Sequence, residues 1–456
     1  MKKIFLTTSI IILLILSYNF IANDFNNERF YKKLVPVQVK EFLKKTIFKR
    51  SLENQKLKDK IIALEIERDK IKENNLNLSL KLREEIFRKK RISFELENKK
   101  TVKSKENENY EVTLYITDDL FIGKNPARNP KASAYLDLYD NKLFLASGDG
   151  IISFLDNYSN KSQSLLSFKI INSNLENLVD KKDFFSSSYN GVKDLEIFQD
   201  KIFLSYSDKL DIDKKCHILS VAQAKINVEF LNFKKIFSTK ACGIRSDAKN
   251  LNGLYSQGGR LQIDNNFLYL TIGTFGSELQ AQKDSNYLGK IIRLSLNDEN
   301  YIPEVLSKGH RNPQGMFLNT REKFLYLTEH GPNGGDEINF LDLQSKSRPS
   351  NYGWPISSYG EHVIGGKSLK DVKDMYETMP LHKSHKEFNF IEPIFHFKKS
   401  AAISQIIQTE SEKENLDNLY VGTLGRENME NQLELHNFKV ERKTKKVVYH
   451  DRVKIN

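Results

Sequence analysis

The sequence predicts an all-β six-bladed propeller that follows an N-terminal transmembrane helix and an α-helical coiled-coil stalk. Three observations lead to this prediction: an uncharged apolar stretch near the N-terminus, a heptad-spaced polar segment after it, and a short apolar–aromatic pattern that recurs five times in the remaining chain. We expect a membrane anchor or signal segment at residues 1–22, a linker at 23–50, the stalk at 51–100 and the propeller at 110–456.

Composition limits the class of protein. With 456 residues, 39% of them apolar and 29% charged, the chain is neither collagen-like nor wholly disordered. The net charge is +12, and the first 100 residues hold 24 Lys and Arg against 13 Asp and Glu, which leaves only +1 for the rest. A main domain so close to neutral argues against nucleic-acid binding, and we expect no nucleic-acid partner.

The N-terminal stretch at residues 4–22 carries no charge and follows Lys2 and Lys3. Its 19 residues, at about 1.5 Å each, can just cross a hydrocarbon core of ~30 Å. An uncleaved transmembrane anchor and a cleaved secretory signal both fit this pattern. Either one exports the rest of the chain. We therefore expect a single-pass protein of the inner membrane with its main domain in the periplasm.

The segment at residues 51–100 lacks Gly and Pro, and apolar residues recur in it at intervals of three and four. This spacing is typical of a coiled coil, which would make the protein a homo-oligomer, although a single solvated helix also fits it. Eight of the twelve seam positions are apolar. The twelve positions are Leu57, Ile61, Leu64, Arg68, Ile71, Asn75, Leu78, Leu82, Glu85, Lys89, Ile92 and Leu96.

The main domain contains a repeated pattern of an apolar residue, an aromatic residue, Leu or Val, and a small residue. Intervals of 50–60 residues are typical of propeller blades. A sixth copy would lie beyond the chain end, so the last blade either closes irregularly or is incomplete; unrelated strands of a sandwich are the alternative. The five aromatic residues are Phe144, Phe203, Tyr269, Tyr326 and Tyr420.

The two cysteines, Cys216 and Cys242, exclude a disulfide-rich scaffold and a four-cysteine zinc module. In an oxidising compartment we expect them to form a disulfide, with two free structural thiols as the alternative.

Three segments rich in Gly, Pro and Asn are candidates for the functional site: residues 309–315 (GHRNPQG), 329–339 (EHGPNGGDEIN) and 351–355 (NYGWP). Backbone carbonyls beside Asp336 and Glu337 offer the oxygen ligands that calcium prefers. Arg311 beside Asn312 offers a forked cation and an amide for a carboxylate or an oxyanion. A capped turn and a salt bridge between blades are the structural alternatives for these residues.

These segments resemble, in sequence and in order, those of the quinoprotein sugar dehydrogenases of the glucose/sorbosone dehydrogenase family. The resemblance covers roughly residues 130–456 and is dense at 255–355. It implies a six-bladed propeller that holds pyrroloquinoline quinone (PQQ) and calcium at one face. It also implies oxidation of an aldose to a lactone, in which a base takes the hydroxyl proton and the anomeric carbon passes a hydride to the quinone.

The resemblance also implies a role for individual residues. Arg311 and Asn312 would face the quinone oxygens, and Asp336 would support them from close by. The carbonyls of Gly331 and Pro332 would bind the calcium that touches PQQ. Glu337 matches an acidic position associated with a second, structural calcium.

The sequence departs from the family pattern where the catalytic base is expected. The family has a His just before a Gly-Arg-Leu run, but here Gly259-Arg260-Leu261 follows Tyr255-Ser256-Gln257-Gly258. Tyr255 or Ser256 would have to replace the His, and a missing general base typically costs about 10²–10⁴ in rate.

Other cofactor-binding positions are altered too. A family Gln falls near Tyr189 or Asn190, and a family Lys falls on Gly425 beside Arg426. The late Arg-x-Arg-Asp motif is reduced to Arg452 and Lys454, which leaves two cations for the PQQ carboxylates.

Two functions of different classes follow from these observations. The first is a membrane-tethered, periplasmic sugar dehydrogenase that uses PQQ and calcium. The second is a non-catalytic, calcium-stabilised propeller that binds a sugar, an envelope component or a protein. A third, a calcium-dependent lactone hydrolase, needs a ring of acidic and Asn ligands that the sequence does not assemble.

Overall fold

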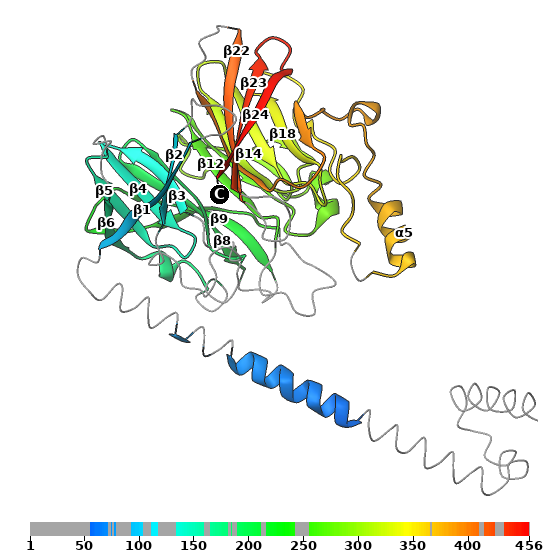
Figure 1. The fold of residues 1–456 in the computed structure, drawn as a ribbon, viewed down its shortest axis with the longest axis horizontal. Helices are drawn as coiled ribbons and strands as arrows, with labels where there is room; N and C mark the ends of the chain where they lie inside the picture. Colours follow the sequence, from blue (N-terminus) through cyan, green and yellow to red (C-terminus); the bar gives the residue numbers. More distant parts are fainter. Residues whose placement is uncertain are drawn as a thin grey trace, which may run out of the picture. The chain divides into compact units, whose positions relative to one another are not determined.

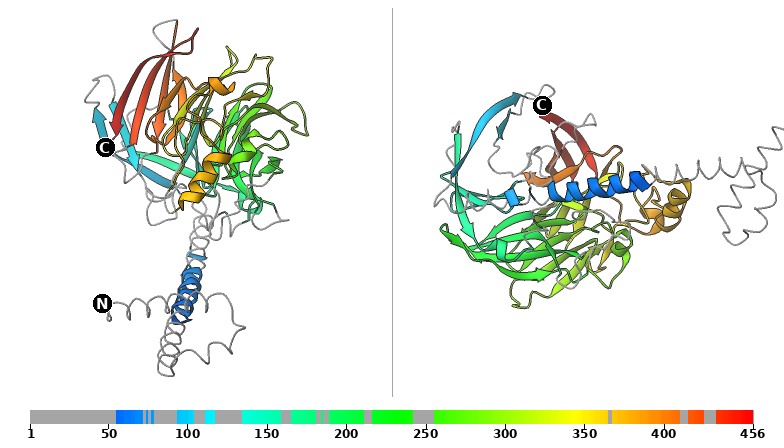
Figure 2. Two further views of the ribbon diagram at one scale, coloured as in Figure 1. Left: turned by 90° about the vertical axis from the view of Figure 1, so that its right-hand side faces the viewer. Right: turned by 90° about the horizontal axis from the view of Figure 1, so that it is seen from below.

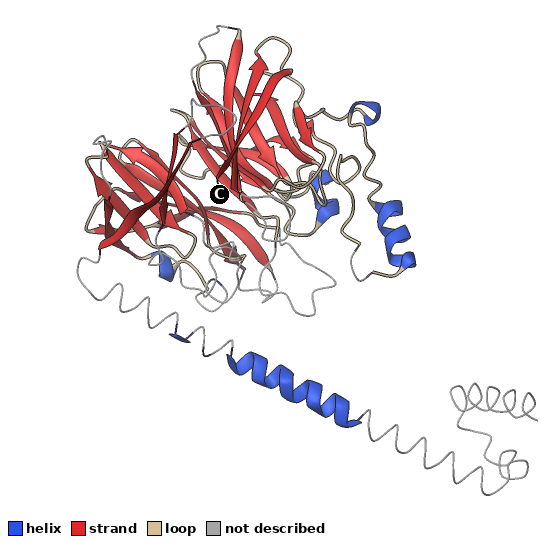
Figure 3. Ribbon diagram, viewed as in Figure 1, coloured by secondary structure: helices blue, strands red, loops and turns tan. Residues whose placement is uncertain are grey.

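The computed structural model describes residues 55–71, 74, 77–78, 93–103, 111–116, 134–158, 165–180, 184, 189–210, 216–241, 255–364, 367–409, 415–424 and 433–455. The chain divides into two compact units, Met1–Asn75 and Leu76–Asn456. The first unit contributes a helix at residues 55–71. The second consists mainly of strands (Figure 3).

The second unit contains five sheets, of which the first two come from its N-terminal half (Figure 1). The first sheet has the order β2-β1-β6-β5-β4-β3, with β10 beside β6, and the second has the order β11-β9-β8-β7. Their strands are β1 Ser93–Lys103, β2 Glu111–Ile116, β3 Ala134–Tyr139, β4 Lys142–Ser147, β5 Ile152–Asp156, β6 Leu165–Ser173, β7 Val192–Phe198, β8 Lys201–Lys209, β9 His217–Lys225, β10 Phe230–Leu231 and β11 Lys234–Ser238.

The other three sheets have the orders β12-β13-β14-β15-β19, β16-β17-β18-β20 and β21-β22-β23-β24. Short helices lie in the connections: η2 Leu175–Asn177, η3 Glu278–Gln282, α5 Leu369–Thr378 and η4 Lys386–Phe388. The strands are β12 Gly258–Ile263, β13 Phe267–Ile272, β14 Lys290–Ser295, β15 Pro303–Lys308, β16 Pro313–Asn319, β17 Phe324–Glu329, β18 Asp336–Asp342, β19 Ser350–Asn351, β20 Phe395–Phe397, β21 Ile403–Thr409, β22 Leu416–Thr423, β23 Leu433–Glu441 and β24 Val447–Ile455.

The sheets follow one another as the blades of a propeller (Figure 2). The strands β3, β7, β12, β16 and β21, one from each sheet, pack against one another in that order. Four hydrophobic clusters fill the spaces between successive sheets. The core is therefore a series of interfaces between blades, and the inner strands line the axis.

The five sequence repeats are the second strands of the five sheets. Because side chains alternate along a strand, the aromatic residue and the following Leu face opposite neighbours. Phe203 packs against the third sheet, whereas Leu204 packs against the first. Tyr420 is only half-buried, because no sheet follows its own among the described residues.

The prediction of six blades is wrong, since the described residues form five sheets. Each sheet corresponds to one visible copy of the repeat, and the sixth blade was inferred without a copy. The final strand, β24, completes the fifth sheet rather than beginning another.

The predicted coiled-coil stalk at residues 51–100 is also wrong. Part of it is helical, but residues 93–103 form strand β1, which pairs with β2 and β6. Phe94 and Leu96 lie opposite Phe168 and Leu166 of β6. The spacing of apolar residues there fits the alternation of a strand better than a helical seam.

The predicted transmembrane helix and single-pass inner-membrane location are not supported. In the described ranges, no helix combines the length and apolarity needed to cross a membrane. The apolar stretch at residues 4–22 lies outside those ranges.

Cys216 is buried and disulfide-bonded, which confirms that it is not a free thiol. Cys242 lies just outside the described residues.

Candidate active site

All three predicted segments contribute to one pocket at the ends of strands of the third and fourth sheets. The space that it encloses is about 10 Å³, close to the minimum for one water molecule, so most of a small-molecule ligand would lie outside it. The lining residues are Gly309, Arg311, Glu329, His330, Gly331, Gly335, Glu337, Tyr352, Trp354, Ser357, Ser358 and His385.

Arg311 is the cation of this pocket. Its Nη1 donates hydrogen bonds to the carbonyl oxygens of Gly331, at 2.8 Å, and His330, at 3.2 Å. The guanidinium carbon lies 5.4 Å from the centre of the Trp354 ring. Nε is buried and has no hydrogen-bond partner among the described residues. Arg311 therefore keeps one donor for an oxygen atom of a ligand.

Glu329, at the end of β17, holds the backbone of this arginine and the side chain of the residue before it. One carboxylate oxygen accepts a hydrogen bond from the backbone N–H of Arg311, and the other lies 2.9 Å from Nδ1 of His310. Nε2 of His310 lies 2.8 Å from the Ser307 hydroxyl, and its ring stacks on Tyr352 at 4.6 Å. His310 is fully buried, so this array supports the pocket and is not itself open to a substrate.

Asn312 holds the connection to the third sheet. Its Oδ1 accepts hydrogen bonds from Gln314 Nε2 at 2.7 Å and from the Gly258 N–H at 3.2 Å. Its Nδ2 lies 3.4 Å from Nδ1 of His330, whose Nε2 lies 2.6 Å from the Ile403 carbonyl oxygen. The His330 imidazole thus has a partner at each nitrogen.

Asp336 ties the loop after β17 to the start of β21. Its Oδ1 accepts a hydrogen bond from the Gly331 N–H at 2.9 Å, and its Oδ2 accepts from the N–H groups of Ala401 and Ala402 at 2.9 and 2.7 Å. The side chain is buried. These three bonds give Asp336 a supporting position beside the pocket.

Glu337 forms a buried ion pair with His385, with 3.4 Å between Oε1 and Nε2. Burial raises the pKa of Glu337 despite the opposing effect of His385. Burial alone would lower the pKa of His385, but the charge of Glu337 raises it overall. Neither ring nitrogen of His385 has a hydrogen-bond partner among the described residues. The pair therefore faces the pocket with unused polar capacity.

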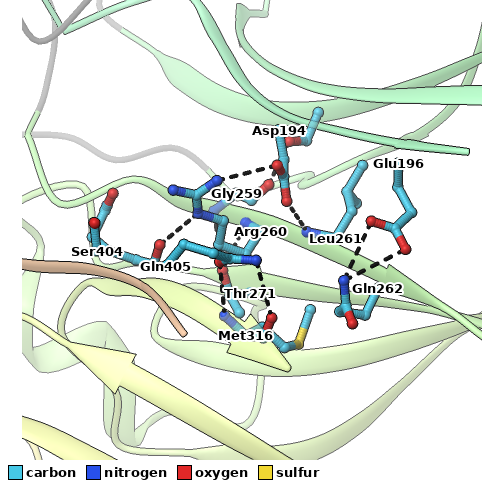
Figure 4. Close-up of polar contacts among 12 residues, drawn as sticks. Asp194, Glu196, Gly259, Arg260, Leu261, Gln262, Thr271, Met316, Ser404 and Gln405 are labelled. Carbon is cyan, nitrogen blue, oxygen red and sulfur yellow. Dashed lines mark hydrogen bonds and ion pairs between the residues drawn. The ribbon is translucent and has the colours of Figure 1, made fainter. Parts of the chain in front are cut away.

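The Gly259-Arg260-Leu261 run forms a junction between three sheets (Figure 4). Arg260 pairs with Asp194 of β7 at 3.1 Å, and its Nε donates to the Gln314 carbonyl oxygen at 2.5 Å. The Leu261 N–H donates to Asp194 at 2.8 Å. This run therefore fixes the inner strands that carry the segment before it.

The residues before this run contain no ordinary base. Ser256 is buried, with a φ of +58°. Gln257 accepts a hydrogen bond from Ser207 and donates one to Asn190 Oδ1 at 3.4 Å. Tyr255 is half-buried.

Comparison with known proteins agrees with this arrangement of segments. The model of the glucose/sorbosone dehydrogenases matches residues 160–454. The chain belongs to the glucose/sorbosone dehydrogenase family.

Individual relatives of the family match over parts of their length. Aldose sugar dehydrogenase YliI of Escherichia coli is 28% identical over 264 residues, which cover 53% of this chain and 64% of that protein. Quinoprotein glucose dehydrogenase B of Acinetobacter calcoaceticus is 30% identical over 117 residues, or 22% of this chain and 23% of that protein. The chain thus matches less than two thirds of either relative.

Solved structures support the fold. The soluble aldose sugar dehydrogenase of Escherichia coli, in its apo-form, has a TM-score of 0.50 at 23% identity and covers 72% of this chain and 88% of its own. A glucose dehydrogenase has a TM-score of 0.51 at 20% identity, with coverages of 70% and 86%.

Not all the predicted cofactor residues of this member of the glucose/sorbosone dehydrogenase family lie together. Arg452 and Lys454 lie on β24, the outer strand of the fifth sheet, and Arg452 contacts Glu434 at 3.4 Å. Arg426 lies outside the described residues. Of the three predicted cations that the structure describes, Arg311 is the one that lines the pocket.

The residues present fit a quinone cofactor better than they fit calcium. The buried, unpartnered Nε of Arg311 suits an oxygen acceptor. By contrast, the Gly331 carbonyl already accepts from Arg311, and Glu337 already faces His385. The Pro332 ring packs closely against Gly360, since a Cβ added at Gly360 would lie 2.8 Å from the Cδ atom of Pro332. A calcium ion would have to displace Arg311 from the Gly331 carbonyl and His385 from Glu337.

Sequence reasoning missed several residues of the pocket. Ser357, Ser358 and His385 come from the segment after NYGWP, in which the sequence analysis identified no motif. Glu278 also contacts the site, through Trp354. Nothing in the sequence around His385 signals its burial or its contact with Glu337.

Proposed function

We propose that this protein oxidises aldose sugars to lactones with PQQ as the hydride acceptor. The observation that carries the proposal is Arg311, a cation in the pocket beside Trp354 that retains a buried donor without a partner. When bound, PQQ supplies a quinone that accepts the hydride and becomes the quinol. Membership of the family supports the reaction class.

The residues of the chain would bind and orient this cofactor. The Arg311 guanidinium would donate to a quinone oxygen and stabilise the negative charge that develops there. Asn312, which does not line the pocket, would hold the connection that carries Arg311. Asp336 and Glu329 would hold the loops that carry these groups, through the backbone contacts given above.

The proposal includes calcium at two places. The carbonyls of Gly331 and Pro332 would bind one ion, and the Glu337 carboxylate would bind a second. Oxygen donors of this kind suit a hard cation. Because Arg311 and His385 already contact two of these oxygens, we expect the requirement for calcium to be weak.

A non-catalytic binding propeller is the second candidate. It is favoured by one observation, the absence of an ordinary base among Tyr255, Ser256 and Gln257. On that proposal the same pocket would bind a sugar or a PQQ-like ligand without turnover.

The test is a single-turnover measurement on the full chain supplied with PQQ, with calcium or with a chelator. A panel of aldoses is added, and quinone reduction is followed by absorbance. Wild-type protein and Arg321→Ala, an exposed arginine of the same sheet, should reduce PQQ. Arg311→Ala should lose reduction. Binding of PQQ without reduction by any aldose would support the second candidate instead.

A further inference from the structure

The only Trp of the chain, Trp354, contacts the Glu278 carboxylate and the Arg311 guanidinium. Its Nε1 donates a hydrogen bond to Glu278 Oε2 at 2.7 Å, and Arg311 lies over its ring. The indole is 6% exposed. A cation on the face of a desolvated indole is attracted by the ring. The orientation of the ring therefore affects where the guanidinium rests.

Glu278 is held in turn by its own surroundings. It begins the short helix η3, between β13 and β14, and Thr274 Oγ1 donates to the same carboxylate oxygen at 2.8 Å. At the other end of η3, Gln282 donates to the Trp354 carbonyl oxygen at 2.7 Å and exchanges hydrogen bonds of 2.8 and 3.1 Å with Asn351. One short helix thus holds both the ring and the backbone of Trp354.

A buried lysine fixes this helix to the sheet. Lys290, on β14, is fully buried, and its Nζ donates to the carbonyl oxygens of Gln280, Ala281 and Leu288 at 3.1, 2.9 and 2.8 Å. A cation at the last carbonyls of a helix satisfies acceptors that the helix cannot. The position of η3, and with it Glu278, is therefore determined by the sheet.

We propose that Glu278 is a positioning residue of the candidate active site, which fixes the Trp354 indole and through it the Arg311 guanidinium. Glu278 lies outside the three segments that the family resemblance singled out. The consequence for cofactor binding rests on the proposed function, but the positioning itself does not.

Fluorescence excited selectively in tryptophan tests the proposal directly, because Trp354 is the only tryptophan. Glu278→Ala should shift the emission to longer wavelength and make the ring more accessible to acrylamide. Glu278→Gln, whose amide oxygen can still accept the hydrogen bond, should restore the wild-type spectrum. Glu299→Ala removes an exposed glutamate of the same sheet and should change nothing. If Glu278→Ala does not fold, as judged by circular dichroism, Glu278→Asp replaces it, because the shorter carboxylate should no longer reach Nε1.

A second comparison tests the coupling to Arg311. Arg311→Ala should alter the Trp354 emission strongly when Glu278 is present. In the Glu278→Ala background it should alter the emission less, because the guanidinium is no longer held on the ring there. PQQ, titrated by quenching, should bind about tenfold more weakly to Glu278→Ala, the loss expected for one hydrogen bond.

Two results would overturn the proposal: unchanged emission and quenching in the folded Glu278 variant, or an Arg311→Ala effect that is the same with and without Glu278. Absence of PQQ binding and reduction in every variant would count against the proposed function alone, because the emission of the cofactor-free protein still reports on positioning.

Discussion

Asp194 of β7 and Arg260 of β12 form an ion pair between two neighbouring sheets, with 3.1 Å between Oδ1 and Nη1. Their side chains are 8% and 13% exposed. Burial raises the pKa of Asp194, and the charge of Arg260 opposes this rise. Because Asp194 also accepts the Leu261 N–H, it aligns the inner strand that leads away from the pocket.

Replacing Asp194 by Ala should therefore destabilise the fold strongly. Loss of one partner of a buried pair leaves the other charge uncompensated, which typically costs about 3–5 kcal/mol. The measurement is the free energy of unfolding in urea. Asp284→Ala, which breaks an exposed pair with Lys308, is the control and should have little effect. Equal losses in the two variants would show that the Asp194–Arg260 pair is no stronger than a surface pair.

Asp336 is expected to stabilise the loop of the pocket. Asp336→Asn replaces a carboxylate that accepts three backbone N–H bonds by an amide with one acceptor oxygen. We expect a loss of about 2–3 kcal/mol in the free energy of unfolding, together with weaker PQQ binding. Asp374→Asn, at an exposed position of α5, should leave both unchanged. A stable Asp336→Asn protein that fails to reduce PQQ would instead indicate a direct role in the chemistry.

The tight turn at Gly335 should not tolerate a side chain. Its φ is +68°, and a Cβ would lie 2.1 Å from the Gly360 nitrogen. Gly335→Ala should lose about 2 kcal/mol or more and displace the loop, which a blue or red shift of Trp354 emission would report. Gly422→Ala is the matched control, since its Cβ would meet only the Ser404 hydroxyl at 3.3 Å. A Gly335→Ala protein as stable as Gly422→Ala would contradict the account.

The sequence was sufficient to identify the strands that matter most. The repeat around Phe144, Phe203 and Tyr269 predicts second strands because an aromatic and a Leu on opposite faces suit a sheet packed on both sides. The number of sheets could not be predicted, because closure of the ring depends on contacts between distant strands. At Leu96, apolar spacing was compatible with both helix and strand, and pairing with β6 decided between them.

The site was predicted only in part, for a related reason. Arg311 and Glu337 belong to short Gly-rich motifs that can be read locally. Their partners, Trp354 and His385, are 43 and 48 residues away in the sequence, and only the fold brings them near. No local signal links Glu278 to Trp354.

His436 should make the fold sensitive to acid. Burial, with the charges of His450 and Arg452, lowers its pKa to about 4, against ~6.5 in the unfolded chain. As the pH falls from about 6.5 to 4, the unfolded state gains a proton that the folded state does not bind, so stability is lost across this window. The full loss is about 3 kcal/mol.

The test is the difference between two pH profiles rather than one profile alone. Asp137 acts in the opposite direction, because burial raises its pKa to about 6 and so stabilises the fold as the pH falls through that value. This contribution cancels when His436→Gln is compared with wild type by urea unfolding. The variant should lose less stability between pH 7 and pH 4.5, while the two profiles should run parallel above about pH 7.5, where the imidazole is neutral in both states. Parallel profiles over the whole range would rule out His436 as the acid-sensitive group.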